Sequence, residues 1–266
     1  MPIQSVSRAF SILSLFSSNK PVLTLAEVSK ELGLAKATAY GIMTTMRETG
    51  YLDYDKKKAH YMLAAKYIEL GGIVVKNLRI NREGREIACR LANDAGVVCR
   101  IGIWDRDSIL VSLQSTPMAH AEQPSRLGPR VPAYCTALGK AFLSSVSKEE
   151  LDGYLDSLVP LPYTPRTITD VNDIRKELDT TKERGYSISE EEALLGQSGL
   201  GVPILGPEGR PLGAISLSGL TVKVLGDQIE TLAGELRGAA GEISYNLGYY
   251  PQPVKKKQDL KENMNE

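Results

Sequence analysis

The segment 24-TLAEVSKELGLAKATAYGIMTTMRETGYLDYDKKKAHYML-63 decides how the N-terminal part of this chain folds. Its first four residues, Thr24 to Glu27, form a capping box, in which the hydroxyl and the carboxylate satisfy free N–H groups at the start of a helix. Gly33 marks the end of that helix, because glycine adopts a positive φ at low cost. Two short helices joined by such a turn are typical of a helix-turn-helix, whose second helix enters the major groove of DNA. The apolar residues expected on the buried faces of these helices are Leu25, Val28, Leu32, Leu34, Ala39, Ile42 and Met46.

The other face of the second helix, together with a hairpin that follows it, is the predicted DNA-binding surface. The outward-facing residues of the helix are Lys36, Ala37, Thr38, Tyr40, Gly41, Thr44 and Arg47. Tyr51–Tyr54 and His60–Leu63 are short β-prone strands, which the charged tip Asp55–Ala59 joins. The lysines of this tip are expected to contact phosphate groups, and they are Lys56, Lys57 and Lys58. The segment therefore predicts a winged helix-turn-helix.

The distribution of charge supports DNA as a partner. The whole chain of 266 residues has a formal net charge of zero, but residues 1–66 hold nine Lys and Arg against five Asp and Glu. Neutralised phosphates supply most of the nonspecific affinity for DNA, so a basic N-terminal part is expected of a DNA-binding protein. Because the excess is small, we expect two copies of the chain to bind together as a dimer.

Several classes of protein are excluded by composition. The chain has no apolar run of membrane-spanning length, and its first residues lack the apolar core of a secretory signal, so we expect a cytoplasmic protein with no membrane partner. Its three cysteines, Cys89, Cys99 and Cys135, are widely separated and predict neither a disulfide framework nor a zinc site. With two histidines, His60 and His120, we expect no metal site.

Helices are expected on both sides of the helix-turn-helix. The helix over Ser5–Ser17 is expected to pack behind the DNA-facing helices through Val6, Ala9, Phe10, Ile12, Leu13 and Phe16. Ala65–Leu78 predicts a linker helix that is broken or bent at Gly71-Gly72 and sets the spacing of two DNA-binding heads. The expected divisions are a DNA-binding domain over 1–64 and a linker over 65–80.

From residue 81 the pattern becomes that of an α+β domain, which is expected to extend to residue 248. Helices are predicted at about 81–93, 136–143, from 147, at 170–184 and at 228–247, and strands at 97–103, 108–113, 186–190, 201–205 and 212–218. We expect the strands to form a mixed or antiparallel sheet. The tail, 249–266, has almost no apolar residues and is predicted to be disordered.

With both parts laid out, the sequence resembles the IclR family of bacterial transcriptional regulators. The motifs that carry the resemblance lie in family order: QSVSRAFSILSLF, LAEVSKELGLAKATAYGIMTTMRETGYL, HYMLAAKYIELG, VPAYCTALGKAFL, RGYSISEEEALLGQSGLGVPIL and GAISLSG. The resemblance implies a winged helix-turn-helix, a linker helix and a C-terminal effector-binding and oligomerisation domain similar to GAF domains. It also implies a homodimer or dimer of dimers on double-stranded operator DNA. Such a regulator represses or activates a catabolic operon under the control of an organic acid, a sugar acid or an aromatic compound, and repression is the expectation here.

The resemblance also implies an effector pocket. Its residues here are Ala137, Leu138, Ser189, Gly199, Ser216 and Ser218. The free N–H groups at a helix start and two hydroxyls make a suitable cradle for a carboxylate. Family members that bind small acids have aspartate where Ser189 stands and cysteine where Gly199 stands, so we expect volume freed at Gly199 and a different or larger ligand. In the recognition helix Ala35 lacks the usual N-cap hydroxyl and Gly41 replaces a common arginine.

Catalysis is not predicted, and neither a catalytic residue nor a cofactor is expected. The run Glu190-Glu191-Glu192 is interpreted as a solvated loop, and Cys135 has no nearby histidine in its motif to act as a base. Gly199–Ile204 lacks the third glycine of a dinucleotide fingerprint. Two alternatives to an effector-controlled regulator remain, namely an enzyme with a DNA-binding head and an architectural DNA-binding protein without a ligand.

Overall fold

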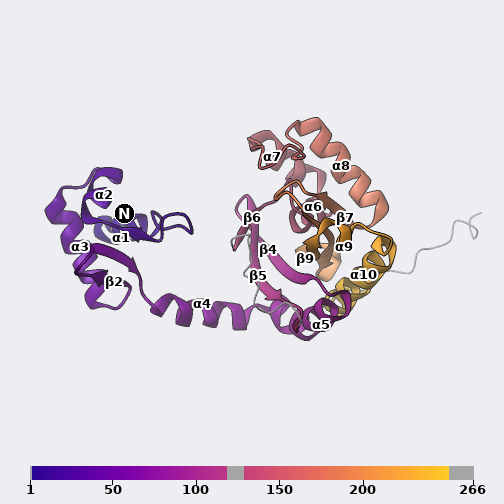
Figure 1. Cartoon of the computed structure of the whole chain (residues 1–266), viewed down its shortest axis with the longest axis horizontal. Coiled ribbons are helices and arrows are strands. Elements are labelled where there is room, and N and C mark those ends of the chain that lie inside the picture. The colour runs from indigo at the N-terminus through magenta and orange to yellow at the C-terminus, as the bar shows by residue number, and fades with distance from the viewer. Residues whose placement is uncertain (1, 119–128, 252–266) are drawn as a thin grey trace, which may run out of the picture. The chain divides into compact units, whose positions relative to one another are not determined.

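The computed structural model describes residues 2–118 and 129–251 of the chain, which divides into two units, Met1–Asn77 and Leu78–Glu266 (Figure 1). The prediction of a disordered tail lies, from residue 252 on, outside the described residues. Within the described residues, no helix combines the length and the apolar content that crossing a membrane requires. Also within them, no cluster of three or more His, Cys, Asp or Glu side chains is arranged to hold a metal ion.

The N-terminal unit is the predicted winged helix-turn-helix. Its elements are α1 (Gln4–Leu13), β1 (Val22–Leu23), α2 (Leu25–Glu31), α3 (Lys36–Glu48), β2 (Leu52–Asp55), β3 (His60–Leu63) and α4 (Lys66–Asn77). The capping box is present, since Thr24 Oγ1 accepts a hydrogen bond from Glu27 N at 3.2 Å and Glu27 Oε2 accepts one from Thr24 N at 2.7 Å. Gly33 leaves α2 with a φ of +61°. The three strands form an antiparallel sheet in the order β1-β3-β2.

Some details of the N-terminal unit differ from the sequence prediction. Met43 is fully buried in α3, whereas the predicted core residue Ile42 is only half-buried. On α1, Val6 and Phe10 are 48% and 64% exposed, so the expectation that they pack behind the DNA-facing helices is wrong. The expected break in the linker helix is also wrong, because α4 runs without interruption from Lys66 to Asn77. Neither linker glycine meets a neighbouring atom that would force a break.

The C-terminal unit is built on a six-stranded antiparallel sheet in the order β6-β5-β4-β9-β8-β7. Its strands are β4 (Val98–Asp105), β5 (Ser108–Ser115), β6 (Arg130–Pro132), β7 (Ser187–Glu190), β8 (Gln197–Leu205) and β9 (Pro211–Leu220). Its helices are α5 (Arg79–Ala95), α6 (Ala137–Leu143), α7 (Lys148–Ser157), α8 (Val171–Arg184), α9 (Thr221–Val224) and α10 (Ile229–Asn246), with a short 3-10 turn at Pro207–Gly209. The α+β fold class is confirmed, and the short β6 and α9 are additions to the prediction.

Helices cover both faces of this sheet. One apolar core lies between the sheet and the pair α5 and α10, and a second lies between the sheet and α6, α7 and α8 (Figure 1). Alternate residues of a strand point to opposite faces, so each central strand contributes to both cores. For example, Ile215 belongs to the first core and Ala214 to the second. The start of α6 therefore lies against the sheet face that carries the candidate pocket residues.

Candidate functional site

The recognition helix α3 presents a mostly open outer face. Lys36, Ala37, Tyr40 and Gly41 are exposed, and Tyr40 retains 52% of its accessible surface. Thr38 and Arg47 are half-buried. No side chain caps the N-terminus of α3, as the alanine at position 35 predicts. The exposed N–H groups of the first turn and the side chains around them therefore remain available to a phosphate or a base edge.

Thr44 departs from its predicted role. The residue is half-buried, and its Oγ1 atom is buried without a hydrogen-bond partner among the residues that the structure describes. The expectation that this hydroxyl lies on the outward face is therefore wrong. Met43 is buried where the sequence pattern placed Ile42, so the buried stripe of α3 is shifted by one position toward Thr44.

The wing is a tight hairpin with its lysines at the tip. Asp55 Oδ1 accepts hydrogen bonds from the backbone N–H groups of Lys57 at 2.8 Å and Lys58 at 3.2 Å, which fixes the turn. Ala59 completes the turn with a φ of +54°. Lys56, Lys57 and Lys58 are all exposed, so their ammonium groups can reach a phosphate backbone without losing an internal partner.

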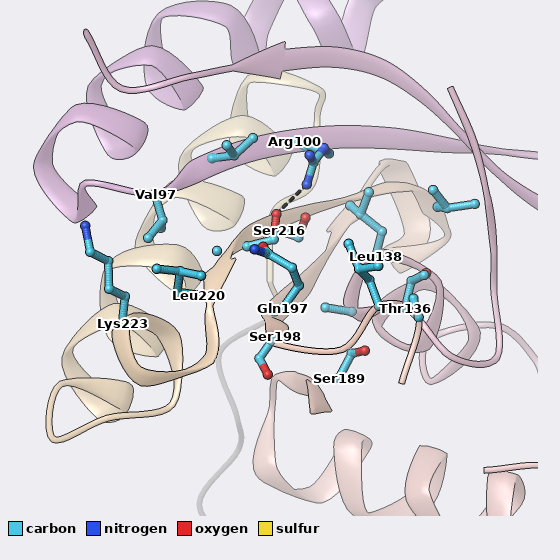
Figure 2. Close-up of a pocket in the computed structure, with 18 of the residues that line it drawn as sticks. Val97, Arg100, Thr136, Leu138, Ser189, Gln197, Ser198, Ser216, Leu220 and Lys223 are labelled. Carbon is cyan, nitrogen blue, oxygen red and sulfur yellow. Dashed lines mark hydrogen bonds between the residues drawn. The ribbon is translucent and has the colours of Figure 1, made fainter. Parts of the chain in front are cut away.

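The C-terminal unit contains a cavity of about 650 Å³ on the α6 side of its sheet (Figure 2). All six residues that the resemblance assigned to an effector pocket line it. The lining comes from the start of α6, from β4, β5, β6, β7, β8 and β9, from α9, and from the loop between β7 and β8. Figure 2 shows Thr136 and Leu138 facing Ser216 across this space. A volume of this size is typical of a site for a small molecule.

Strand register brings the polar lining residues together. Ser216 pairs with Gly201 of β8 on one side and with Arg100 of β4 on the other, and Ser218 pairs with Gly199. Because Ser216 and Ser218 are two residues apart on one strand, their side chains point to the same sheet face, as the sequence predicted. Both line the cavity, and Ser216 is only 3% exposed.

The glycines of β8 allow α6 to approach the sheet. A Cβ atom on Gly201 would lie 2.3 Å from the carbonyl oxygen of Ala137, so no larger residue fits there without moving the backbone. A Cβ atom on Gly199 would lie 3.1 Å from the Cβ atom of Ala137. The expectation that Gly199 leaves free volume for a larger ligand is therefore wrong, because the methyl group of Ala137 already occupies the space in front of it.

Hydrogen bonds hold the start of α6 in place. Thr136 Oγ1 accepts a hydrogen bond from Gly139 N at 3.3 Å and donates one to the carbonyl oxygen of Pro132 at 2.6 Å. Ser189 Oγ donates to the carbonyl oxygen of Cys135 at 2.9 Å. The hydroxyl of Ser189 therefore braces the loop before α6, while the N–H groups of Ala137 and Leu138 belong to the first turn, which has no partners inside the helix.

Arg100 is the functional candidate that the sequence reasoning missed. It is only 8% exposed, it lines the cavity, and its Nε donates to Gln114 Oε1 at 2.9 Å. Its Nη1 donates to Ser218 Oγ (Figure 2). Burial lowers the pKa of Arg100, although an arginine side chain stays protonated in proteins. The signal was visible in the sequence, since Arg100 is the one charged residue in the apolar segment 97–103.

A buried ion pair joins α6 to the loop after β7, and it corrects the interpretation of the glutamate run. Glu192 is 5% exposed, and its Oε1 accepts a hydrogen bond from Lys140 Nζ at 2.5 Å, so it is not part of a solvated loop. Burial raises the pKa of Glu192 above its ordinary value. Lys140 Nζ also donates to the carbonyl oxygen of Ile188 at 3.0 Å. Burial raises the pKa of the Cys135 thiol to about 12, so this cysteine is not a ready nucleophile.

Both units match models of one known protein family. The family model described as the IclR helix-turn-helix domain matches residues 5–56, and the one described as the bacterial transcriptional regulator IclR C-terminal matches residues 73–245. The HTH-type transcriptional regulator XynR of Escherichia coli (strain K12) is 32% identical over 251 residues, covering 94% of this chain and 99% of the relative. The transcriptional repressor IclR of the same strain is 24% identical over 250 residues, covering 92% and 90%.

Two solved structures are similar to this chain in fold. The crystal structure of the Thermotoga maritima IclR has a TM-score of 0.72 and 29% identity, covering 92% of this chain and 99% of the other. An IclR homologue of Microbacterium hydrocarbonoxydans, solved in complex with 4-hydroxybenzoate, has a TM-score of 0.76 and 20% identity, covering 92% and 99%. At that identity the second likeness concerns the fold alone.

Proposed function

This chain belongs to the IclR family of bacterial transcriptional regulators, and from that premise we propose that it represses a catabolic operon until a small-molecule metabolite binds in the cavity of its C-terminal unit. It is a DNA-binding regulator and not an enzyme. Repression is favoured because relatives include proteins named as repressors. The cytoplasmic location expected from the sequence stays a prediction.

One observation carries the ligand part of the proposal. Six residues that sequence motifs single out, in four separate parts of the chain, line one cavity of about 650 Å³. A cavity with polar groups at one side and apolar walls elsewhere is the usual form of a small-molecule site. The homologue solved with 4-hydroxybenzoate supports an organic effector, and organic acids, sugar acids and aromatic compounds remain the candidate classes.

The DNA part of the proposal assigns roles along α3 and the wing. Lys36, Thr38 and Tyr40 lie near the start of the recognition helix and are proposed to reach base edges. The proposed contacts to the phosphate backbone are the remaining outer residues, Ala37, Gly41, Arg47, Lys56, Lys57 and Lys58. Thr44 leaves this set because its hydroxyl is buried.

A homodimer or a dimer of dimers completes the proposal. Apolar side chains of α1 and α4 are open to solvent in the single chain: Ile3 at the start of α1, Val6 and Phe10 within it, and Ile68, Ile73 and Val74 in α4. None of the residues of α4 is buried. Exposed apolar side chains on α1 and α4 favour a protein interface, and two heads on one operator would add the phosphate contacts that a single weakly basic head lacks.

The proposal is tested in two steps, beginning with DNA. An operator is first selected from a pool of random duplexes by binding to the full chain, and its affinity is then compared with that of random DNA by fluorescence anisotropy. Thr38→Ala and Tyr40→Ala should weaken operator binding by about 5- to 150-fold, which corresponds to roughly 1–3 kcal/mol for a lost base contact, while binding to random DNA changes little. Equal losses on both duplexes would instead make these residues backbone contacts or structural residues.

The second step separates a ligand-controlled regulator from an architectural DNA-binding protein. A metabolite library is screened by thermal shift, because a ligand present at 100 times its dissociation constant stabilises the folded state by about 2.7 kcal/mol. Each hit is then added to the operator complex, and we expect at least one hit to release the DNA. The architectural alternative would be supported if the protein binds its operator but no compound in the library changes either its melting temperature or its binding to the operator.

A further inference from the structure

We infer that Tyr51 is a positioning residue, which fixes the direction in which the linker helix α4 leaves the DNA-binding head and so sets the spacing of the two operator half-sites that a dimer binds. The head is the part of the N-terminal unit before α4, residues 2–65. This inference rests on the proposed function, since it requires a homodimer with one head on each half-site. It adds a residue to that function, because Tyr51 is not among the residues proposed to contact DNA.

The backbone of Tyr51 connects the recognition helix with the wing. Beyond the end of α3, Gly50 has a φ of +79°, and Tyr51 N then donates a hydrogen bond to the carbonyl oxygen of Met46 at 2.8 Å. The carbonyl oxygen of Tyr51 accepts a hydrogen bond at 3.3 Å from the backbone N–H of Ala64, the residue that follows β3. The next residue, Leu52, begins β2 and is buried. Tyr51 is therefore held between the end of α3 and both strands of the wing.

The side chain of Tyr51 contacts the first turn of α4. Its ring meets the ring of Tyr67 edge-on, with the two ring centroids 5.8 Å apart and the ring planes inclined by 67°. Lys66 Nζ lies 4.9 Å from the centroid of the Tyr51 ring. Edge-to-face rings attract each other, and a cation is attracted to the face of an aromatic ring. Both contacts come from the first two residues of α4, so together they restrict the tilt and the rotation of the helix.

The rest of α4 is open to solvent in the single chain. None of its residues is buried, and Ile68, Ile73 and Val74 are exposed. A Cβ atom added to Gly71 or Gly72 would meet no heavy atom within 4 Å. The contact of the first turn with Tyr51 is therefore well placed to set the axis of the whole helix.

Tyr67 contributes its ring to this contact and not its hydroxyl. The residue is half-buried, and its hydroxyl oxygen is buried without a hydrogen-bond partner among the residues that the structure describes. A buried hydroxyl without a partner costs free energy, so it does not account for the position of the ring. We therefore expect Tyr67→Phe to keep the contact with Tyr51 and Tyr67→Ala to remove it.

A small tilt at Tyr51 becomes a large displacement at the far end of α4. The helix has 12 residues and is about 18 Å long, at a rise of roughly 1.5 Å per residue. A tilt of about 20° moves its far end by about 6 Å, which is close to the rise of two base pairs of DNA. The direction of each linker therefore determines how far apart the two heads of a dimer lie. A loosened contact at Tyr51 should let the dimer accept half-sites at several spacings.

The test compares operators that differ only in the spacing of their half-sites. The operator selected from random duplexes is synthesised again with its half-sites moved apart by one, two, three or five base pairs, and a duplex with a single half-site is the reference. Each duplex is titrated with the full-length protein and followed by fluorescence anisotropy. The wild type should bind the selected spacing at least about 10-fold more tightly than the spacing with two added base pairs.

Variants then assign this spacing preference to the contact between Tyr51 and α4. Tyr67→Ala and Tyr51→Leu should each reduce the preference to within about threefold, while the affinity for the single half-site stays within about threefold of the wild type. Tyr67→Phe is the matched control and should behave as the wild type does. A less stable head would weaken binding to every duplex by the same factor, so it would leave the ratio between spacings unchanged.

If Tyr51→Leu does not fold, Tyr67→Ala carries the test by itself, because residue 67 lies outside the recognition helix and the wing and alanine favours a helix. An unchanged spacing preference in Tyr67→Ala would overturn the inference, as would a Tyr67→Phe variant that loses the preference to the same extent. The dimer of the proposed function fails separately. A wild type that binds one half-site as tightly as the whole operator would reject the dimer. A wild type that needs both half-sites but accepts every spacing would keep the dimer and reject the role of Tyr51.

Discussion

Lys140 is 2% exposed, although it carries a charge. Its ammonium group donates to Glu192 Oε1 at 2.5 Å and to the carbonyl oxygen of Ile188 at 3.0 Å, and it lies 3.7 Å from Glu177 Oε1. These contacts join α6 to α8 and to the strand and loop that follow α8. Breaking one partner of a buried ion pair is costly, because the other charge is then left without compensation.

Lys140→Met should therefore destabilise the protein by about 3–5 kcal/mol near neutral pH. Burial already raises the pKa of Glu192, and removing the ammonium group raises it further. A raised carboxyl pKa means that the folded state binds a proton more readily than the unfolded state, so stability falls as pH rises through the folded-state pKa. The loss of stability relative to the wild type should be largest near pH 8 and should shrink toward about pH 5. Urea unfolding of both proteins at these two pH values measures it.

The double variant Lys140→Met, Glu192→Leu is the control for this prediction. It removes both charges, so it should recover most of the lost stability and its deficit should not depend on pH in this range. A single variant whose deficit is equal at both pH values would mean that packing, and not the charge of Glu192, accounts for the loss.

A second prediction at this scale compares two glycines. Gly201→Ala places a Cβ atom 2.3 Å from a backbone oxygen of α6, so it should destabilise the C-terminal unit by about 1–3 kcal/mol. Gly153→Ala lies within α7 with no heavy atom within 4 Å of the added Cβ, and it should stabilise by about 0.5–1 kcal/mol. Denaturant unfolding of both variants measures the contrast, and similar effects at the two sites would contradict the close approach of α6 to β8.

At the scale of elements, the wing and the recognition helix divide the proposed DNA contacts between them. The wing is held by the turn at Asp55 and by the packing of Tyr54 against Tyr61, whose ring centroids are 4.6 Å apart. Its three lysines are exposed at the tip, and each ammonium group is at the end of a flexible side chain. Lysine binds phosphate as a point charge, so these residues should add affinity without reading sequence.

Replacing Lys56, Lys57 and Lys58 by alanine should therefore weaken binding to any duplex. Affinity falls with salt, and each lost phosphate contact reduces the magnitude of the slope of log affinity against log salt by about 0.9. Three lost contacts therefore reduce it by about 2.7. Anisotropy titrations at a series of salt concentrations measure the slope. The matched control removes three exposed lysines from the C-terminal unit, Lys148, Lys176 and Lys182, and should leave the slope unchanged. Equal slopes for wild type and the wing variant would place the wing away from DNA.

At the scale of the whole molecule, the two units perform separate tasks that regulation must couple. The N-terminal unit carries the DNA-binding elements, and the C-terminal unit carries the cavity. A ligand can release operator DNA only if it binds the released state more tightly than the DNA-bound state. A variant that alters the cavity alone should therefore change the response to ligand and leave operator affinity intact when no ligand is present.

The double variant Ser216→Ala, Ser218→Ala tests this separation. It should fold, dimerise and bind operator normally, but its response should require about 5- to 150-fold more effector, since a ligand group loses its hydrogen-bond partner at a cost of roughly 1–3 kcal/mol. The measurement is operator binding titrated with the effector found by the library screen. An unchanged midpoint would place the ligand elsewhere, and loss of operator binding without ligand would give these serines a structural role.

The sequence by itself determined the features that depend on neighbouring residues. The capping box at Thr24, the left-handed glycine at position 33 and the alternation of Ser216 and Ser218 all follow from local geometry, and each is present in the structure. The motifs also predicted the six residues that line the cavity. Errors remained where a helix face depends on what packs against it, as for Val6, Phe10 and Thr44, because periodicity shows which residues share a face and not how much of that face is covered.

Only the tertiary structure decided the chemistry inside the C-terminal unit. The bond from Arg100 to Ser218 joins residues 118 positions apart, and the bond from Lys140 to Glu192 spans 52 positions. The first depends on the pairing of β4 with β9, and the second on the packing of α6 beside the loop that follows β7. The linear sequence gives neither the burial nor the partners of a lone arginine in an apolar strand or of a run of three glutamates. Both are set only when distant segments of the chain pack together.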